Sequence, residues 1–170
     1  VSIWSPLIRL VGAVLPNRLL YLPFSITSSS MAMAARKKSE VNNQQLSVIM
    51  PAYNEASTIK ASIDKVLGKR LEGIGIELII VESNSQDGTK ELVSNYVEHP
   101  QVTVIIEHEA RGKGHAVRAG LKIASGDFVL IQDADDEYDI EDYDALLEPL
   151  RDGREAFILG TRHGGGGLRM

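Results

Sequence analysis

Cysteine is absent from all 170 residues of the sequence. Its absence excludes a scaffold held together by disulfides and a cysteine-based zinc site, and it fits a reducing compartment. An excess of positive charge is missing as well, since 18 lysines and arginines are outnumbered by 23 aspartates and glutamates, for a net charge of -5. Such a chain has no general basic field that would attract nucleic acid. We therefore expect no nucleic-acid partner, and we expect a cytoplasmic location.

A long, uninterrupted apolar run is also lacking, although residues 1–26 are rich in apolar side chains. A membrane-spanning helix needs roughly 20 predominantly apolar residues, whereas Arg9, Arg18 and three prolines break this stretch. Prolines at such intervals argue against one continuous helix, and no signal-peptide cleavage pattern is evident. We interpret residues 1–45 as an N-terminal extension and linker that is either disordered or loosely associated with the membrane face.

Three familiar signatures of nucleotide and hydrolase chemistry are missing. The sequence contains no G-x-x-x-x-G-K-[ST] phosphate loop, and the nearest approach to a G-x-G-x-x-G dinucleotide fingerprint, at residues 112–117, lacks its third glycine. The G-x-S-x-G elbow of serine hydrolases is absent too. The chemistry of this chain must therefore come from other residues.

A regular alternation of short apolar runs and helical patterns begins at Leu46. The predicted strands start about 25 to 30 residues apart, and an amphipathic helix pattern follows each of the first four. This rhythm is typical of repeated βαβ units, which form a parallel sheet covered by helices on both faces. The predicted fold class is therefore α/β. The predicted strands are Leu46–Met50, Ile76–Val81, Val102–Ile106, Phe128–Ile131 and Ala156–Leu159.

The polar clusters of the sequence directly follow predicted strands, and the opposite strand ends carry little chemistry. In open α/β sheets, ligands bind beyond the carboxyl ends of the strands. The pattern therefore indicates one catalytic or ligand-binding edge. Its clusters are Tyr53–Glu55, Glu82–Asp87, Arg111–Lys113 and Asp133–Glu137.

The segment Asp133-Ala134-Asp135 comes directly after a predicted buried strand. Its i, i+2 spacing lets both carboxylates converge on one cation, and hard oxygen ligands suit Mg²⁺ or Mn²⁺, which also hold substrate phosphates. Arg111 and Lys113, on a glycine-containing loop after another strand, would add positive charge. Together these residues describe a diphosphate site. The alternatives are acids that only solvate a loop and cations that are ordinary surface charge.

The residues nearer the start of the domain each allow two interpretations. Tyr53 can stack on a flat ring or be a half-buried core tyrosine, and Glu55 can bind a ligand or simply begin a helix. Glu82 can accept a hydrogen bond from a base, or it can be a loop acid held by Ser85 and Thr89. The Asp87–Thr89 segment is interpreted as turn and helix-cap chemistry.

The helix predicted after Lys113 carries two further polar side chains. His115 is interpreted as a helix-surface or partly buried histidine rather than a catalytic one. Arg118, one turn further along, is interpreted as a helix-face residue. Neither is predicted to belong to the site.

Five segments, in order, resemble the inverting family 2 glycosyltransferases of the GT-A fold, most closely the polyprenyl-phosphate (dolichyl-phosphate type) mannosyl- and glucosyltransferases. The resemblance covers residues 46–163, which we interpret as the nucleotide-sugar-binding domain, and leaves residues 164–170 as a flexible tail. Ser47–Glu55 resembles the first strand and its P-x-Y-N-E turn, and Val81–Thr89 resembles the V-D-D-G-S-x-D-G-T loop. Arg111–Gly120 resembles the G-K-G-x-A-x-x-x-G segment, and Gly126–Asp135 resembles the strand that ends in D-A-D. Leu159–Arg162 resembles the G-S-R turn.

The resemblance implies a Rossmann-like nucleotide-binding half and a hexosyltransferase activity. A sugar would pass from a UDP- or GDP-linked donor to a polyprenyl phosphate or glycan acceptor by metal-assisted displacement. The implied nucleotide- and donor-binding residues are Pro51, Tyr53, Glu55, Glu82, Arg111, Lys113, Asp133 and Asp135. The implied ligands of Mg²⁺ or Mn²⁺ are Asp133, Asp135 and Glu137.

Two departures from the family pattern limit what is implied. Ser83 replaces the second acid of the usual pair after the second strand, which leaves the choice between UDP and GDP open. The catalytic base is expected beyond Met170, so the chain is expected to be truncated. A non-catalytic nucleotide-binding module and a nucleotidyltransferase-like enzyme are the alternatives, although Pro51–Glu55 is not the glycine- and arginine-rich first loop of the latter. The sugar and the oligomeric state stay open.

Overall fold

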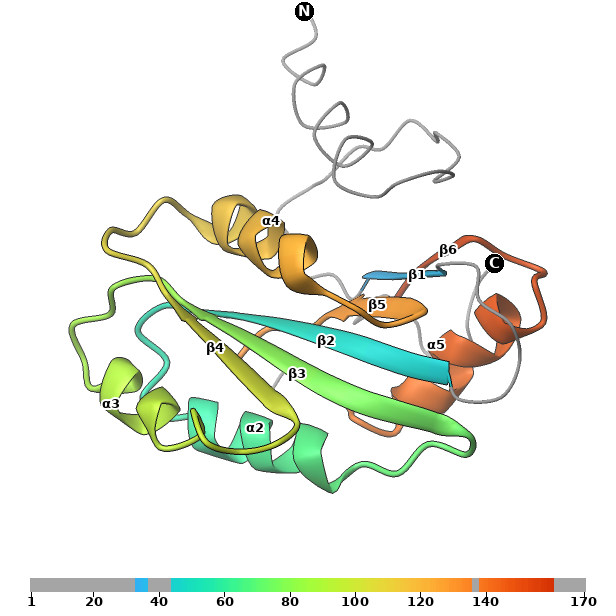
Figure 1. The fold of residues 1–170 in the computed structure, drawn as a ribbon, viewed down its shortest axis with the longest axis horizontal. Coiled ribbons are helices and arrows are strands. Elements are labelled where there is room, and N and C mark those ends of the chain that lie inside the picture. Colours follow the sequence, from blue (N-terminus) through green and yellow to red (C-terminus); the bar gives the residue numbers. More distant parts are fainter. Residues whose placement is uncertain (1–32, 37–43, 136–137, 161–170) are drawn as a thin grey trace, which may run out of the picture.

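The computed structural model describes residues 33–36, 44–135 and 138–160. These residues form one mixed sheet with helices on both faces (Figure 1). The strands are β1 (Met33–Arg36), β2 (Gln44–Ala52), β3 (Ile74–Glu82), β4 (Val102–Ile106), β5 (Phe128–Ile131) and β6 (Phe157–Leu159). The helices are α2 (Ile59–Gly68), α3 (Thr89–Ser94), α4 (Lys113–Ile123) and α5 (Asp142–Arg151).

The order of the strands confirms the predicted α/β class. The sheet runs β4-β3-β2-β5-β1-β6, and β4, β3, β2 and β5 are mutually parallel. The chain moves outward from β2 through β3 to β4, and it then returns to the other side of β2 to form β5. This reversal creates a switch point between β2 and β5, where α/β sheets bind ligands.

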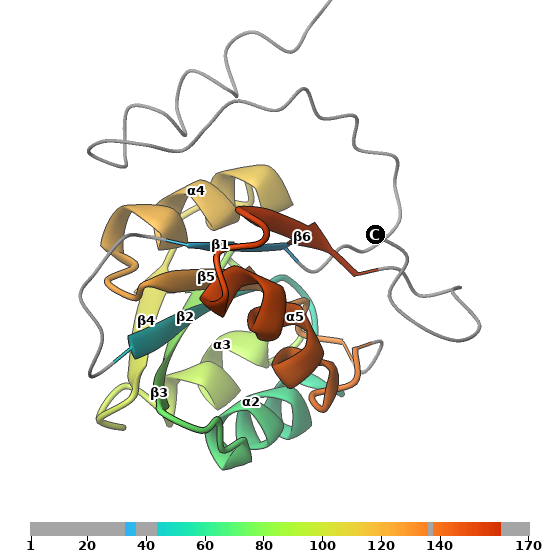
Figure 2. The ribbon, with the colours of Figure 1, turned by 90° about the vertical axis from the view of Figure 1, so that its right-hand side faces the viewer.

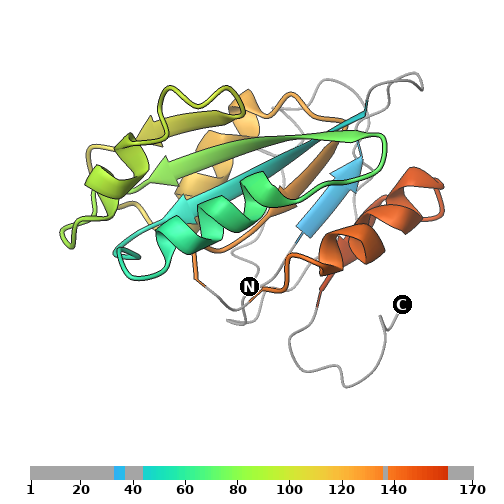
Figure 3. The same cartoon turned by 90° about the horizontal axis from the view of Figure 1, so that it is seen from below.

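Two core layers follow from the alternation of side chains along the strands. In β2, Leu46, Val48 and Met50 pack in the larger cluster with α2, α3 and α5, whereas Ile49 joins the smaller cluster under α4. Figures 1 and 3 show α4 alone on one face and α2 and α3 on the other. Helix α4 lies close to the sheet because Gly120 has no side chain: a Cβ there would lie 2.5 Å from Ile49 Cγ2.

Strands β1 and β2 both take in residues of the segment 1–45 that was interpreted as an N-terminal extension and linker. Met33–Arg36 pairs antiparallel with β5 on one side and with β6 on the other (Figure 2), and β2 already begins at Gln44. The Met-Ala-Ala-Arg segment has no β-branched or aromatic residue, so its intrinsic preference for a strand is weak. Its backbone is held by two neighbours that lie far away in the sequence, and a local pattern cannot reveal such pairing.

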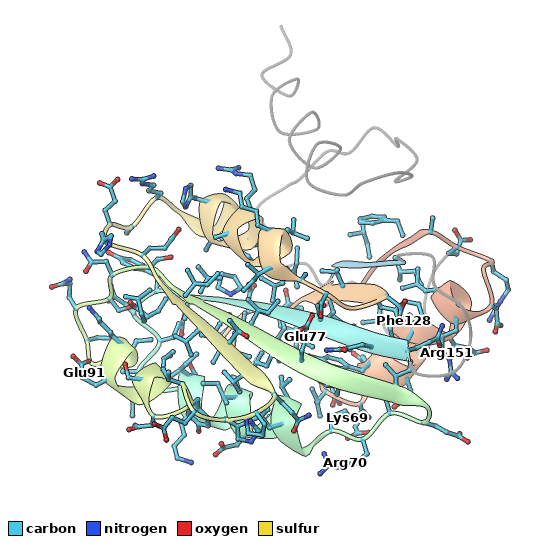
Figure 4. The ribbon with its side chains drawn as sticks, viewed as in Figure 1. Lys69, Arg70, Glu77, Glu91, Phe128 and Arg151 are labelled. Carbon is cyan, nitrogen blue, oxygen red and sulfur yellow. The ribbon has the colours of Figure 1, made fainter. Side chains whose placement is uncertain are left out.

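Polar contacts fasten the edge of the sheet opposite the predicted site. Glu77 of β3, labelled in Figure 4, accepts hydrogen bonds from the backbone N–H of Ser125 at 2.7 Å and of Gly126 at 3.1 Å. Ser47 of β2 also donates its hydroxyl to Glu77. Gly126 has no room for a side chain, since a Cβ would lie 2.7 Å from the backbone oxygen of Gln45. These contacts fix the loop that leads into β5.

A second set of charges joins α2 to α5 on the outer face. Lys69, at the end of α2 and labelled in Figure 4, forms ion pairs with Glu141 at 2.7 Å and with Asp144 at 2.8 Å. Hydrogen bonds to Asp144 and Glu141 raise the pKa of the Lys69 ammonium. Helix α5 is thereby held beside α2.

Some predictions fall outside the described residues. These are the disordered or membrane-associated state of residues 1–32, the metal ligand Glu137 and the tail over residues 164–170. In the ranges that the structure does describe, no helix has both the length and the apolar character needed to cross a bilayer.

Candidate functional site

The site is built at the carboxyl edge of the parallel strands, where four loops start side by side. The register aligns Ala52 with Glu82, and Glu82 with Ile106. Backbone bonds continue this alignment past the strand ends: Ser83 N–H donates to Ala52 O at 3.0 Å, and Glu107 N–H donates to Glu82 O at 2.8 Å. The polar clusters predicted after the strands are therefore brought to one edge.

The loops after β2 and β3 are locked together by side chains of one bonding to the backbone of the other. Asn54 takes a left-handed conformation with φ of 56°, which turns its N–H and its side chain toward the β3 loop. The bonds are Asn54 N–H to Ser85 Oγ at 3.0 Å, Glu55 N–H to Thr89 Oγ1 at 2.8 Å, Ala56 N–H to Asp87 Oδ2 at 2.9 Å and Gln86 N–H to Asn54 Oδ1 at 2.9 Å. The two loops form one preformed platform, called here the β2–β3 platform (residues 53–56 and 83–89).

The carboxylate of Asp87 joins the two loops of this platform. Its Oδ1 accepts from the Thr89 hydroxyl at 2.6 Å and from the Thr89 N–H at 3.0 Å, and its Oδ2 accepts from Ala56. The hydroxyl of Thr89 and then the N–H of Ala56 hold the pKa of Asp87 below its ordinary value. The predicted turn chemistry is confirmed, and the same carboxylate also joins the two loops.

Glu82 is fully buried at the end of β3. Its Oε1 accepts from the backbone N–H of Ser85 at 2.6 Å, and its Oε2 accepts from the N–H of Asn84 at 3.2 Å. Of the two interpretations, these contacts match the loop acid held by Ser85, although the donor is the backbone rather than the hydroxyl. Thr89 bonds to Asp87 instead. A contact of Glu82 with a nucleoside stays a prediction.

Tyr53 and Glu55 occupy the open side of the platform. Tyr53 is 51% exposed and belongs to neither hydrophobic core, so its ring faces solvent rather than the core. Glu55 accepts a hydrogen bond from the Thr58 hydroxyl at 3.0 Å, which places it at the start of the segment leading to α2. Pro51 is part of β2 beside them.

Asp133 and Lys113 meet at the switch point between β2 and β5. Lys113 Nζ, from the first turn of α4, forms an ion pair with the Asp133 carboxylate, whose side chain is only 13% exposed. The Tyr138 hydroxyl donates to the other carboxylate oxygen at 3.3 Å. The structure thus brings together a predicted cation and a predicted acid from loops after two different strands.

The backbone between the two aspartates is anchored from α2. Ser62 Oγ donates to the carbonyl of Ala134 at 3.0 Å and to that of Asp135 at 3.3 Å, and Ala134 is buried. Asp133 and Asp135 therefore flank a fixed, buried alanine. Within the described residues, no group of three or more histidines or acids is placed to hold a metal ion, and Glu137 lies outside those residues.

Arg111 is not joined to the acids at this edge. Its guanidinium pairs with Glu109 of its own loop, and both side chains are largely exposed. This geometry matches the interpretation of Arg111 as ordinary surface charge, and its predicted contact with a donor remains a prediction.

Sequence reasoning missed one connected group at the same edge. Ser83 Oγ donates to Glu107 Oε2 at 2.7 Å, and Glu107 Oε1 bonds to Nδ1 of His115. Ser83 stands where the resembled loop has a second acid, and Glu107 brings a carboxylate to its hydroxyl from the neighbouring strand. The available signal was the position of Glu107 directly after a predicted strand, beside the polar loop that follows the strand before it.

Comparison with known proteins places this geometry in a family. A model of the family described as "Glycosyl transferase family 2" matches residues 47–169. A dolichyl-phosphate beta-glucosyltransferase of Trichomonas vaginalis is 31% identical over 128 residues, 69% of this chain and 40% of that protein. A dolichol-phosphate mannosyltransferase of Saccharomyces cerevisiae is 35% identical over 125 residues, 72% of this chain and 46% of that protein. The chain thus spans less than half the length of these relatives.

A solved structure also aligns with part of the chain. It is the mannosyltransferase PcManGT from Pyrobaculum calidifontis in complex with GDP-Man and Mn²⁺, with 37% identity and a TM-score of 0.48 over 55% of this chain and 28% of that chain. The match of the family model is much wider, since it extends from β2 through the remaining described residues. The match of the family model over residues 47–169 shows that the chain belongs to glycosyl transferase family 2.

Proposed function

We propose that this chain forms the donor-binding part of a glycosyltransferase, which transfers a sugar from a UDP- or GDP-linked donor to an acceptor. The observation that carries the proposal is the pairing of Lys113 with Asp133 at the switch point, beside the preformed β2–β3 platform. At this position the positive side chain can bind the negative diphosphate of a nucleotide, and the negative side chain can bind the cation that accompanies the diphosphate. Membership of the family supports the same activity.

The diphosphate would lie next to Lys113 and the two aspartates. Departure of a nucleoside diphosphate leaves negative charge on its terminal phosphate, and a fixed ammonium at that place stabilises this charge without having to reorganise. Because the Asp133 carboxylate is mostly shielded from solvent and already bonded to one cation, its surroundings suit a positively charged partner.

A divalent cation fits the donor set at this loop. Asp133 and Asp135 offer oxygen ligands only, and in the described residues they have no third acid or histidine placed beside them to complete a protein cage. Mg²⁺ and Mn²⁺ favour such oxygen ligands, and Mg²⁺ is commonly held by one or two carboxylates together with substrate phosphates and water. Asp133, Asp135 and Glu137 would hold Mg²⁺ or Mn²⁺, which supplies Lewis-acid stabilisation of the leaving diphosphate.

The nucleoside would lie on the β2–β3 platform. The exposed ring of Tyr53 offers a face for stacking on a base, while Pro51, Glu55 and Glu82 would line its edge. The bonds between the two loops already hold this surface in place, so little conformational freedom is lost when a nucleotide binds.

The acceptor that we propose is a polyprenyl phosphate at a membrane face. Relatives that match this chain are named for transfer to dolichyl phosphate, in organisms as distant as Trichomonas vaginalis and Saccharomyces cerevisiae. The catalytic base and the acceptor site would be supplied outside the described residues.

Calorimetric titration of the chain with UDP and with GDP, each with and without Mn²⁺, tests the donor site. We expect one nucleotide to bind in a metal-dependent manner, and we expect Asp133→Asn to weaken that binding about tenfold, the effect of losing one charge-assisted contact. Asp152→Asn is the matched control, because Asp152 pairs with Arg154 on the surface beyond α5. Metal-independent or absent binding would refute the proposal, and donor hydrolysis by the purified chain would exclude a module that only binds.

A further inference from the structure

Ser62 is a polar side chain on the face of α2 that packs against the core. It is 1% exposed, and the other buried side chains of this helix are apolar, namely Ile59, Ile63 and Val66. A buried hydroxyl costs free energy unless it finds a hydrogen-bond partner, and serine is a weaker helix former than alanine. Neither packing nor helix propensity therefore accounts for a serine at this position.

The hydroxyl of Ser62 bonds to the loop that carries the two aspartates of the proposed cation site. It donates to the carbonyl oxygens of Ala134, at 3.0 Å, and of Asp135, at 3.3 Å. Ser62 and Ala134 are each 1% exposed, so water does not compete for the shorter of these bonds. One buried side chain thus joins the helix after β2 to the loop after β5, 72 residues away in the sequence.

These two bonds hold the backbone on both sides of Asp135. A peptide group is planar, so a carbonyl that is held in place also holds the plane of its peptide group. The carbonyl of Ala134 belongs to the peptide group before Asp135, and the carbonyl of Asp135 belongs to the peptide group after it. With both planes held, the direction of the Cα–Cβ bond of Asp135 is set, and only the side-chain torsions of its carboxylate remain.

Ser62 can serve as a fixed point because the start of α2 is itself held by the β2–β3 platform. The carbonyl of Glu55 accepts from the N–H groups of Thr58 at 3.1 Å and Ile59 at 2.8 Å, and the Ser62 N–H donates to Thr58 O at 3.1 Å. The Glu55 N–H is bonded in turn to Thr89. Side chains supported from a rigid element hold a site more precisely than a loop alone does. The first turns of α2 therefore connect the platform to the aspartate loop.

We propose that Ser62 is a positioning residue for the divalent cation of the donor, because it holds Asp135 where this residue and Asp133 can ligate the same ion. This inference rests on the proposed function. Mg²⁺ demands a nearly ideal octahedron of ligands, whereas Ca²⁺ accepts larger and more flexible sets of oxygens. A fixed pair of carboxylates favours Mg²⁺, and a loosened pair loses this preference. Ser62 thus contributes to the choice of metal without contacting the metal.

The test compares nucleotide binding in the presence of Mg²⁺ and of Ca²⁺. The dissociation constants of UDP and of GDP are measured by calorimetry on the full chain, at a saturating concentration of each metal. We expect Ser62→Ala to weaken binding with Mg²⁺ about tenfold, as for loss of an outer-shell contact to a metal ligand, and to weaken binding with Ca²⁺ by a much smaller factor. The ratio of two dissociation constants does not depend on the fraction of the chain that is folded, so it separates positioning from folding.

Two further variants remove a hydroxyl elsewhere in the chain. Ser94→Ala is the matched control, because Ser94 lies in α3 and its hydroxyl donates to the carbonyl of Lys90 at 2.7 Å. Tyr143→Phe removes a buried hydroxyl that bonds to Gln132 Oε1, but the backbone of Gln132 stays held by its N–H bond to Ile49 O at 3.0 Å. We expect both variants to keep the wild-type preference for Mg²⁺ over Ca²⁺, even where Tyr143→Phe lowers the midpoint of thermal unfolding.

The ratio of the Mg²⁺ and Ca²⁺ dissociation constants decides the outcome. An unchanged ratio in Ser62→Ala would overturn this inference, and so would an equal fall of the ratio in Ser62→Ala and Tyr143→Phe. In either case, metal-dependent binding by the wild-type chain would leave the proposed function standing. Failure of the wild-type chain to bind UDP or GDP with either metal would overturn the proposed function and this inference together.

Discussion

Replacing Gly120 by alanine tests the close packing of α4 on the sheet. A Cβ at this position would lie 2.5 Å from Ile49 Cγ2, 3.2 Å from Cγ1 and 3.4 Å from Cβ, whereas non-bonded carbons favour separations of about 3.5–4.0 Å. Ile49 is fully buried and its strand is paired on both sides, so neither the side chain nor the backbone can move away freely. The helix must lift, or the contact must stay strained.

The expected loss of stability in Gly120→Ala is the balance of two opposing effects. Overpacking a filled core costs about 1–3 kcal/mol, and alanine returns up to about 1 kcal/mol through its higher helix propensity. We expect Gly120→Ala to lower the free energy of unfolding by about 1–2 kcal/mol, measured by urea denaturation followed by circular dichroism. Equal or greater stability of Gly120→Ala would refute the reasoning.

Two further variants show whether Ile49 is the cause. Gly114→Ala lies in the same helix, and its new Cβ would meet only the Arg118 guanidinium at 3.8 Å, so we expect no loss of stability. The double variant Gly120→Ala with Ile49→Ala should be more stable than the sum of the two single effects predicts, because the alanine at 120 enters the space that Ile49 vacates. Strict additivity would point to a cause other than this contact.

Two predictions about pH dependence follow from the shifted pKa values of Asp87 and Tyr96. Asp87 has a lowered pKa in the folded chain, so it stabilises the fold above its unfolded pKa of about 3.9, and this contribution disappears as the pH falls through the folded value. Asp87→Asn should therefore be less stable than wild type at pH 7, and the difference should vanish in acid unfolding curves near pH 2; a constant difference would contradict this account. Burial and then the bond to Asp64 raise the pKa of Tyr96 to about 12. Its stabilising contribution is complete below the unfolded value of about 10 and is lost as the pH rises through the folded one, so ultraviolet titration should show a late tyrosinate step that Tyr96→Phe removes.

The four parallel strands were predictable because each carries a run of apolar residues at βαβ spacing, and burial of both faces requires such runs. Met33–Arg36 carries no such run, and its partners Leu130 and Ile158 are distant in the sequence. The register between strands is equally hidden in a single sequence, because it is set by the packing of the two core layers.

The candidate site likewise has features that the sequence predicts and features that it does not. The convergence of Lys113 and Asp133 could be anticipated, since strand ends alone place both loops at one edge. The contact of His115 with Glu107 could not, because it depends on the strand register that sets Glu107 beside Ser83. Glu82 shows a third case, in which the position was predicted but the backbone partners of its carboxylate emerged only from the fold of the loop.

The position of β1 has a consequence for the order of events on the ribosome. Met33–Arg36 is made first, yet its place lies between β5 and β6, which are made last among the described strands. The nascent chain can therefore pair this segment only after β5, which ends at Ile131, has left the exit tunnel, whereas β2, β3 and α2 can already assemble. Contacts so distant in sequence form slowly, so β1 would join the sheet at a late step and would stay exposed to proteases in a chain released before β5 is complete.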